Sequence, residues 1–371
     1  MVPNLRFKKF NNNWSRTTIS KVCVCNPKNE DKLDDEFIYI DLESVEKGVL
    51  KSKNIIHLKN APSRAQRILY KNDILFQSVR PYQRNNYLLN EDDDFLQYVA
   101  STGYIQLRTT LNPYFLFQLL NTDKINNEVM LRCTGTSYPA INSNDFSNIL
   151  ITITNDRNEQ NKIAKFFSLI EERIQTQIKI INDYKILKNH IIKSFIKQNG
   201  TSYLLSEIAE LGRGRVINSA EISKQKNPIY PVYSSQTSNN GIMGYLDNYD
   251  YEGEYITWTT DGANAGTVYY RNGKFNCTNV CGILKIKNGY DAYYISNILN
   301  CYTKKYVSTN LANPKLMNNV MANIKINLPS IEQQKHSSKI LQSIEYRVEI
   351  EEDIKLNLVK QKAFLLKNMF I

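Results

Sequence analysis

The sequence lacks the marks of membrane-spanning, secreted and disordered chains. No apolar run approaches the roughly 20 residues of a membrane helix. The N-terminus has no apolar segment followed by a small-residue cleavage site, so we expect a cytoplasmic protein. With 14 glycines and 10 prolines among 371 residues, disorder is not expected. The length suffices for two domains, each with its own core.

Residues that carry catalytic or metal chemistry are also scarce. The three histidines are scattered, and no Ser/His/Asp or Cys/His set can be assembled from them. Cys23 and Cys25 are separated by one residue and Cys277 and Cys281 by three, which is not the spacing of a zinc ribbon. We therefore expect buried free thiols, no metal site, no catalytic residue and no cofactor in this chain.

Two short motifs suggest chemistry but fit other roles better. "NPYF" (112–115) resembles in part the four-residue motif with which adenine methyltransferases grip a flipped base, but it has one proline where that motif needs two. We interpret it as a turn before a helix. The acidic run 91–94 is typical of a solvated loop, and it should face away from nucleic acid because it would repel phosphates.

Positive charge, in contrast, is abundant and evenly spread. The formal net charge is +11, and each of the segments 1–158, 159–198, 199–331 and 332–371 has a net positive charge. This even spread fits an extended basic surface better than a flexible basic arm, and we expect a polyanionic partner.

The chain contains an internal repeat. "EQNKIAKFFSLIEERI" at 159–174 has a second version, "EQQKHSSKILQSIEYRV", at 332–348. Upstream, "YPAINSNDFSNILITI" at 138–153 aligns with "NPKLMNNVMANIKINL" at 313–328 at a constant spacing of 175 residues. "WSRTTISKV" and "SYLLSEIAE" could each open a half. Such a repeat predicts two structural halves with a common frame.

Each half ends in a long predicted helix, over about 158–198 and 330–371. Apolar residues recur along both at a spacing near that of a coiled-coil seam, and helices of this length need a partner to cover the apolar stripe. We expect the interface of the helix pair to contain Ile163, Phe167, Ile170, Ile174, Ile181, Ile340, Ile344, Val348, Leu358 and Leu365. The irregular "KHSS" around His336 obscures where the second helix begins.

The two stripes are natural partners within one chain. The first helix leads away from the first globule and the second starts from the second globule, so mutual packing makes them antiparallel with approximate two-fold symmetry. An alternative is that each helix pairs with another copy of the chain. The predicted fold class is α+β: globules at 1–157 and 199–329 are separated by two long antiparallel coiled-coil helices.

Loops in both globules carry side chains that can read DNA. Arginine forks to guanine or phosphate, asparagine and glutamine pair with adenine, and tyrosine, serine and threonine contact the backbone. The candidates are Arg80, Tyr82, Arg84, Asn85, Thr136, Ser137, Tyr138, Arg213, Arg215, Tyr233, Gln236, Thr260, Asn264, Arg271 and Lys274. The duplicated set favours sequence-specific DNA binding.

Over its full length the chain resembles the specificity subunit of type I restriction-modification systems. The resemblance rests on "LRFKKFNNNW", "NDILFQSVRPY", the helix beginning "EQNKIAKFFSLIEERI", "GEYITWTTDGANAGTVYY" and "IEQQKH". It implies that 1–157 and 199–329 are target recognition domains, each reading half of a split double-stranded DNA sequence. The helices then act as a ruler that sets the unread gap.

The resemblance also implies partners. Such a subunit docks two methyltransferase subunits, which use S-adenosylmethionine, and recruits a restriction and translocase subunit that uses ATP and Mg. Two other classes remain open from the residues: a methyltransferase or nuclease with degenerate motifs, and a structural coiled-coil protein. Cofactor binding or cleavage by the isolated chain would identify the first, and absence of salt-sensitive DNA binding the second.

Overall fold

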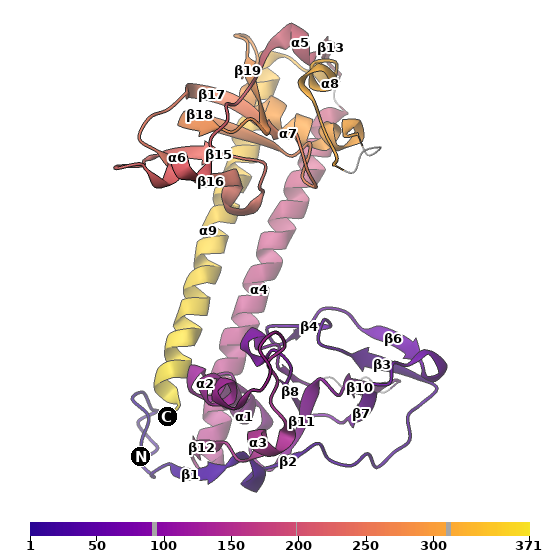
Figure 1. Ribbon diagram of the computed structural model, residues 1–371, viewed down its shortest axis with the longest axis vertical. Coiled ribbons are helices and arrows are strands. Elements are labelled where there is room, and N and C mark those ends of the chain that lie inside the picture. The colour runs from indigo at the N-terminus through magenta and orange to yellow at the C-terminus, as the bar shows by residue number, and fades with distance from the viewer. Residues whose placement is uncertain (91–94, 198, 309–312) are drawn as a thin grey trace. The chain divides into compact units, whose positions relative to one another are not determined.

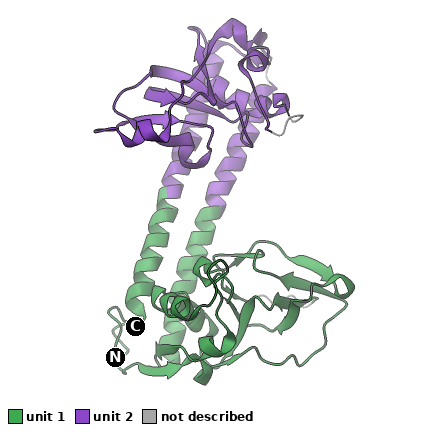
Figure 2. Cartoon of the chain, viewed as in Figure 1, with its two compact units in different colours: residues 1–178, 353–371 green, residues 179–352 purple. Residues whose placement is uncertain are grey.

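The computed structural model describes residues 1–90, 95–197, 199–308 and 313–371. The acidic run 91–94, expected to face away from nucleic acid, lies outside the described residues. The chain divides into two compact units (Figure 2): unit 1 is Met1–Ile178 with Asp353–Ile371, and unit 2 is Lys179–Glu352. Two long helices, α4 (Arg157–Ile196) and α9 (Ile331–Met369), contribute residues to both units.

Unit 1 combines short strands with short helices (Figure 1). Its strands are β1 (Ser15–Thr18), β2 (Cys23–Cys25), β3 (Glu36–Ile40), β4 (Val45–Glu46), β5 (Val49–Leu50), β6 (Asn54–His57), β7 (Ala65–Leu69), β8 (Ile74–Gln77), β9 (Tyr87–Leu88), β10 (Gln97–Ser101), β11 (Tyr104–Thr109) and β12 (Leu150–Ile153). Its helices are α1 (Pro113–Leu120), α2 (Asp123–Arg132) and α3 (Ser143–Ser147). Two four-stranded sheets form, in the orders β6-β3-β10-β7 and β2-β11-β8-β9.

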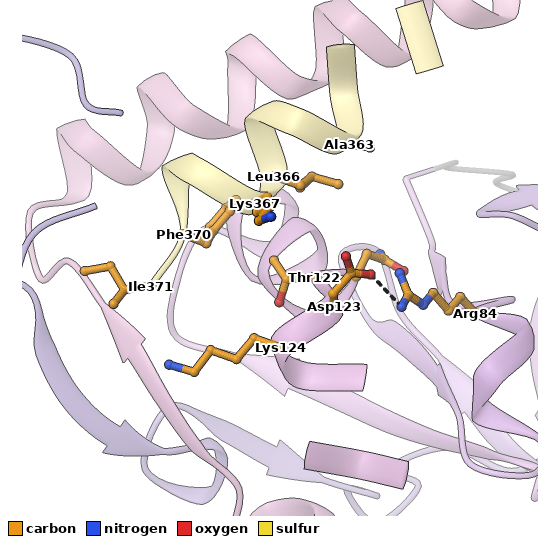
Figure 3. A pocket seen from close by; sticks show the side chains of 10 residues that line it. Arg84, Thr122, Asp123, Lys124, Ala363, Leu366, Lys367, Phe370 and Ile371 are labelled. Carbon is orange, nitrogen blue, oxygen red and sulfur yellow. Dashed lines mark ion pairs between the residues drawn. The ribbon is translucent and has the colours of Figure 1, made fainter. Parts of the chain in front are cut away.

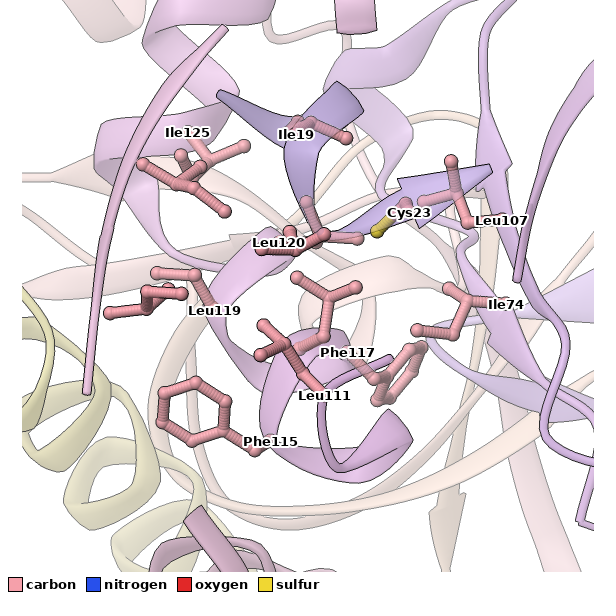
Figure 4. Packing of buried hydrophobic residues seen from close by; sticks show 14 of the residues in the cluster. Ile19, Cys23, Ile74, Leu107, Leu111, Phe115, Phe117, Leu119, Leu120 and Ile125 are labelled. Atoms are coloured by element: carbon pink, nitrogen blue, oxygen red, sulfur yellow. The ribbon is translucent and has the colours of Figure 1, made fainter. Parts of the chain in front are cut away.

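The core of unit 1 packs around α1, as Figure 4 shows for Phe115, Phe117 and Leu120. The side chain of Asn112 caps this helix by accepting a hydrogen bond from the Phe115 amide at 3.1 Å, and Pro113 stands in the first turn, where its missing N–H is not needed. "NPYF" is therefore the cap and the first residues of the helix itself, not a turn before it.

Unit 2 is built on a six-stranded sheet in the order β14-β19-β17-β18-β15-β16. Its strands are β13 (Thr201–Leu204), β14 (Ala209–Arg213), β15 (Tyr230–Tyr233), β16 (Ile242–Leu246), β17 (Tyr251–Thr259), β18 (Val268–Cys277), β19 (Cys281–Ile286) and β20 (Lys325–Leu328). Its helices are α5 (Leu205–Ile208), α6 (Ser219–Ser223), α7 (Ala292–Tyr302) and α8 (Asn318–Ala322). Trp258 is fully buried in the core, and its indole N–H donates to the Leu316 carbonyl at 3.0 Å.

The internal repeat is visible in the strand pairing. β1 pairs antiparallel with β12 in unit 1, and β13 pairs antiparallel with β20 in unit 2. In both units the residue after the first strand donates its amide to the residue before the second: Ile19 to Ile149 at 3.1 Å, and Leu205 to Ile324 at 3.1 Å. The two segments that could open the halves therefore occupy equivalent positions in the two units.

A buried glutamine repeats this frame at the start of each long helix. The Gln160 side chain donates to the Thr154 carbonyl at 2.9 Å and accepts from the amide of Asn112, the cap of α1, at 2.9 Å. The Gln334 side chain donates to the Pro329 carbonyl at 2.9 Å and accepts from the amide of Asp291, the cap of α7, at 3.1 Å. Both are 2% exposed, so each satisfies backbone groups that water does not reach.

The long helices pair within the chain and run antiparallel in each unit. In unit 1, Glu171 forms an ion pair with Lys362, and the Phe167 and Phe370 rings stack at 5.9 Å. In unit 2, Lys185 of α4 forms an ion pair with Glu352 of α9 at 2.8 Å, and Lys188 forms one with Glu345. The partner's number falls as the α4 number rises, so the predicted antiparallel arrangement and the α+β fold class are confirmed.

The predicted interface positions are covered to different degrees. Ile163, Phe167, Ile174, Ile181 and Leu358 are buried, whereas Ile170, Ile340, Ile344, Val348 and Leu365 are half-buried. The "KHSS" segment lies inside α9 rather than before it. Ser337 and Ser338 are buried, and the Ser338 hydroxyl donates to the Asp291 carboxylate at 2.7 Å. Serines occupy buried positions of α9 at which the apolar spacing would place hydrophobic residues, because this part of the helix contacts the polar cap of α7.

Candidate DNA interface

In unit 1 the predicted residues Arg80 and Tyr138 come together. The Arg80 guanidinium lies over the Tyr138 ring, 4.2 Å from its centroid, and Tyr138 is 66% exposed. Both line a groove of about 980 Å³ together with Asn85, whose side chain accepts from the Lys47 amide at 3.1 Å. An arginine, an amide and an aromatic side chain therefore share one open groove, a combination that can contact base edges and backbone.

The other candidate residues of unit 1 do not line this groove. Tyr82, Thr136 and Ser137 are exposed. Arg84 faces a different hollow, formed in unit 1 by the end of α9 and the start of α2 (Figure 3). There it forms an ion pair with Asp123 at 2.7 Å. The structure thus does not bring Arg84 into the groove of Arg80.

Sequence reasoning missed three basic residues that line the groove, Lys47, Lys51 and Arg64. Lys47 stands in the two-residue turn between β4 and β5, where it and Gly48 have φ values of 48° and 87°. A glycine at the second position of a two-residue turn, in the sequence Val45-Glu46-Lys47-Gly48-Val49, is a hairpin signal that the sequence contains. Arg64 reaches the groove from just before β7, and its position depends on the tertiary fold.

In unit 2, Arg213 and Thr260 meet in a charged network. The Arg213 guanidinium donates to the Thr260 hydroxyl at 3.1 Å and to the Asp261 carboxylate at 3.1 Å. Lys315 lies 3.6 Å from the same carboxylate, whose side chain is 18% exposed. Thr260 is fully buried and positions the Arg213 guanidinium, which also donates to the Asn279 carbonyl at 2.5 Å.

Arg215 forms a second cluster with two carboxylates. It pairs with Glu221 at 2.7 Å and with Asp250 at 3.0 Å. The hydrogen bond to Glu221 is the main reason that the pKa of Arg215 is raised, and the same bond lowers the pKa of the Glu221 carboxyl. Because these pairs are partly exposed to solvent, they contribute little stability.

Arg271 lies in the interior and not on the surface. Its exposure is 4%, and its guanidinium stacks on Tyr233 at 3.5 Å and on Tyr269 at 4.4 Å. It donates to the Asn240 carbonyl at 2.9 Å, and burial lowers the pKa of the guanidinium. Gln236 donates to the Ile242 carbonyl in the same loop. Arg271 therefore anchors the loop between β15 and β16 from beneath.

Lys274 and Asn264 occupy other parts of unit 2. Lys274 is exposed, lies 4.5 Å from the Tyr249 ring and is 3.7 Å from Glu252. Asn264 is half-buried in the loop after β17, where its carbonyl accepts from the Thr267 hydroxyl at 2.8 Å. The candidates of unit 2 thus form three separate groups, around Arg213, Arg215 and Arg271, with Lys274 and Asn264 outside them.

Several features bear on other kinds of site. All six cysteines are free, but only Cys23, Cys277 and Cys281 are buried, and Cys301 is exposed, so the expectation of buried thiols was wrong for half of them. Within the described ranges, no group of three His, Cys, Asp or Glu side chains could hold a metal ion. No helix among the described residues is long and apolar enough to cross a membrane.

Comparison with known proteins defines the class. The family model for the type I restriction modification DNA specificity domain matches residues 199–361. A Mycoplasma pneumoniae protein named as the N-terminus of a type I specificity subunit is 43% identical over 142 residues, covering 38% of this chain and 75% of that protein. Another type I specificity subunit of that organism is 37% identical over 191 residues, covering 50% of this chain and 79% of that protein.

Solved structures share the fold over the whole length. The crystal structure of the type I restriction-modification S subunit from M. genitalium matches with a TM-score of 0.64 at 18% identity, covering 100% of this chain and 99% of that one. A chain from a structure of the type I restriction-modification system, described in terms of complex assembly and conformational transition, matches with a TM-score of 0.61 at 19% identity, covering 97% and 98%.

Fold and relatives together make this chain a DNA-recognition protein that assembles with other subunits. It belongs to the specificity subunits of type I restriction-modification systems. As a specificity subunit it directs DNA recognition and is not itself the catalyst, which confirms the predicted family, the non-enzymatic role and the DNA-recognition function.

Proposed function

We propose that this chain reads a bipartite DNA target, with one target recognition domain for each half. Residues 1–157 form the first domain and residues 199–329 the second. The observation that carries the proposal is the duplicated frame, with the same strand pairing and the same buried glutamine, Gln160 and Gln334, beneath two different sets of DNA-reading loops. A common frame with different loops suits two half-sites of different sequence.

The long helices are proposed to set the unread gap between the half-sites. Helices α4 and α9 are continuous over 40 and 39 residues, each about 60 Å at 1.5 Å per residue. Buried apolar positions and ion pairs join them in both units, which supports a stiff spacer. A stiff spacer fixes the number of base pairs between two contacts on a duplex.

The partners follow from the repeat and from the family. Two copies of one methyltransferase subunit can meet two equivalent surfaces on a chain with internal two-fold similarity. We propose that these subunits bind S-adenosylmethionine and methylate adenine. A restriction and translocase subunit that uses ATP and Mg completes the assembly, and the complex works on DNA in the cytoplasm.

The candidate residues are proposed to divide into three roles. Arg80, Arg84, Arg213 and Arg215, with Tyr82, Asn85, Tyr138, Asn264 and Lys274, contact bases or phosphates. Thr136 and Ser137 supply hydroxyls from an exposed loop. Arg271, with Tyr233 and Gln236, supports the loop between β15 and β16, and Thr260 supports Arg213.

A binding titration tests this function. The full chain is assembled with its methyltransferase subunit and titrated against duplexes containing the target, with each half-site scrambled in turn. We expect either scrambled half to weaken binding, by about 1–3 kcal/mol per mismatched base pair, whereas scrambling the gap at constant length leaves the affinity unchanged. Equal affinity for all duplexes would contradict the proposal.

A further inference from the structure

Two loops occupy equivalent places in the two units. One follows β8 in unit 1 and the other follows β17 in unit 2, and each bonds to the segment that precedes α3 or α8. The matching backbone bonds are Arg80 to Pro139 at 2.8 Å and Gly262 to Pro314 at 3.0 Å, and Ile141 to Ser78 at 3.0 Å and Leu316 to Thr260 at 2.8 Å. A turn follows in both, closed by Gln83 to Arg80 at 3.0 Å and Ala265 to Gly262 at 2.9 Å.

The two loops require the same unusual backbone but use different residues for it. Arg80 and Arg84 have φ values of 54° and 55°, and Gly262 and Gly266, at the matching positions, have 93° and 80°. Glycine adopts this region freely, whereas a residue with a Cβ is strained there. Unit 2 meets the requirement with glycine at both positions, but unit 1 carries arginine. Strained residues of this kind cluster at functional sites, where the surrounding structure holds them in place.

The surroundings distinguish the two arginines. Arg84 is occupied by its ion pair with Asp123. Arg80 instead lies over the Tyr138 ring, and its buried Nε has no hydrogen-bond partner among the described residues. Stacking on an aromatic ring restricts the direction of the guanidinium plane and leaves its outer edge free to bond a ligand.

The groove around Arg80 resembles a base-reading surface more than a phosphate site. Its lining mixes donors with acceptors: Glu43, Glu46, Gln83 and Asn85 lie in the same groove as Lys47, Lys51 and Arg64. Carboxylates repel phosphate, but they can accept from the amino group of cytosine, whereas arginine bonds guanine through two acceptors in the major groove. The lining therefore favours base edges.

We propose that Arg80 is a specificity-determining residue that reads a guanine in the half-site of unit 1, and that Tyr138 is its positioning residue. The inference rests on the proposed function. The left-handed backbone at Arg80 directs the side chain from the loop into the groove, and the Tyr138 ring holds it there before DNA arrives. Little side-chain entropy is then lost when the guanidinium meets the base.

The test uses the full chain assembled with its methyltransferase subunit. Arg80→Gly, Arg80→Ala, Tyr138→Ala and Tyr138→Phe are titrated against the target duplex, against a scrambled duplex and against duplexes changed at one base pair of the unit 1 half-site. Arg16→Ala removes one exposed positive charge from β1 of the same unit and serves as the control. The thermal midpoint of each variant is measured in parallel.

We expect both Arg80 variants to bind the target roughly 5- to 150-fold more weakly and to lose discrimination at a single G·C pair. Arg80→Gly should melt at a higher temperature than Arg80→Ala, because glycine relieves the strain that alanine keeps. Tyr138→Ala should lower the affinity and the discrimination at the same pair, and Tyr138→Phe, which keeps the ring, should retain both. Arg16→Ala should retain the discrimination.

Three results would contradict the inference. If the unchanged chain prefers its target and Arg80→Gly keeps full affinity and discrimination, Arg80 does not belong to the site. An equal loss on the target and scrambled duplexes would assign Arg80 to a phosphate. Loss of discrimination in Tyr138→Phe equal to that in Tyr138→Ala would exclude positioning by the ring. A wild-type chain that prefers no duplex would instead overturn the proposed function itself.

Discussion

Adding seven residues to each long helix is expected to lengthen the gap in the DNA target by up to about three base pairs and to leave both half-sites unchanged. Seven residues add about 10 Å of helix, and a base pair occupies about 3.4 Å of the duplex. They also make nearly two full turns, so the apolar stripe rotates by only about 20° and the helices can still pair.

The boundary between the two units supplies the insertion points. A copy of residues 172–178 is added after Ile178, and a copy of residues 353–359 is added before Asp353. The target is then read by sequencing methylated adenines in a host that carries the variant and its methyltransferase. Thr176→Ala with Asn357→Ala, at two exposed helix positions, changes the helices without lengthening them and should keep the gap. An altered half-site, or an unchanged gap in the lengthened chain, would exclude the ruler.

Replacing Arg6 with methionine is expected to destabilise unit 1 by about 3–5 kcal/mol, because it leaves a buried carboxylate without its partner. The Glu159 side chain is 0% exposed, and Arg6 bonds it through two nitrogen atoms at 2.6 and 2.8 Å. Arg6 also donates to the Asn12 carbonyl at 2.6 Å. One guanidinium thus joins the N-terminal segment to the first turn of α4.

Tryptophan fluorescence can follow each unit separately, because one of the two tryptophans, Trp14, lies in unit 1 and the other, Trp258, in unit 2. Urea unfolding is monitored by Trp14 in a Trp258→Phe background. Combining Arg6→Met with Glu159→Gln removes the buried charge and should recover most of the loss. Arg132→Met breaks a pair with Glu128, whose side chain is 39% exposed, and should cost no more than about 1 kcal/mol. If Arg6→Met lowers the free energy of unfolding no more than Arg132→Met does, the buried pair contributes little to stability.

The long helices and the repeat could be predicted because periodicity is a local signal. The apolar spacing placed both helices to within a few residues, and the constant spacing of 175 residues marked the common frame. The alignment of the two phrases needed the structure, however. The sequence pairs "EQ" at 159–160 with "EQ" at 332–333, whereas the hydrogen bonds match Gln160 to Gln334. A shift of one residue is invisible until the backbone partners are known.

The loops that carry candidate DNA-contacting residues could be selected from the sequence, but the burial and the bonding partners of each side chain could not be predicted. In the sequence, Arg215 and Arg271 look alike, because each follows a strand-like segment and has turn-forming residues beside it. One pairs with Glu221 and Asp250 at the surface, and the other is buried against Tyr233, 38 positions earlier in the chain. That burial depends on the parallel pairing of β15 with β18, which brings distant segments together and leaves no local mark.

The strain at Arg80 shows a further limit of sequence reasoning. Glycine in "DGANAG" indicates a turn, but arginine in "SVRPYQR" does not reveal that the same left-handed backbone is required. Only the matching hydrogen bonds of the two loops make the comparison between Arg80 and Gly262 possible. An internal repeat can therefore identify a functional side chain when its second copy keeps the backbone and omits that side chain.

The most direct test of the bipartite reading is to sequence the methylated adenines in a host that expresses this chain with its methyltransferase, beside a host with the methyltransferase alone. We predict a split motif that depends on the chain, with two short defined halves separated by a fixed number of undefined bases. A continuous motif, or the same methylation without the chain, would contradict it.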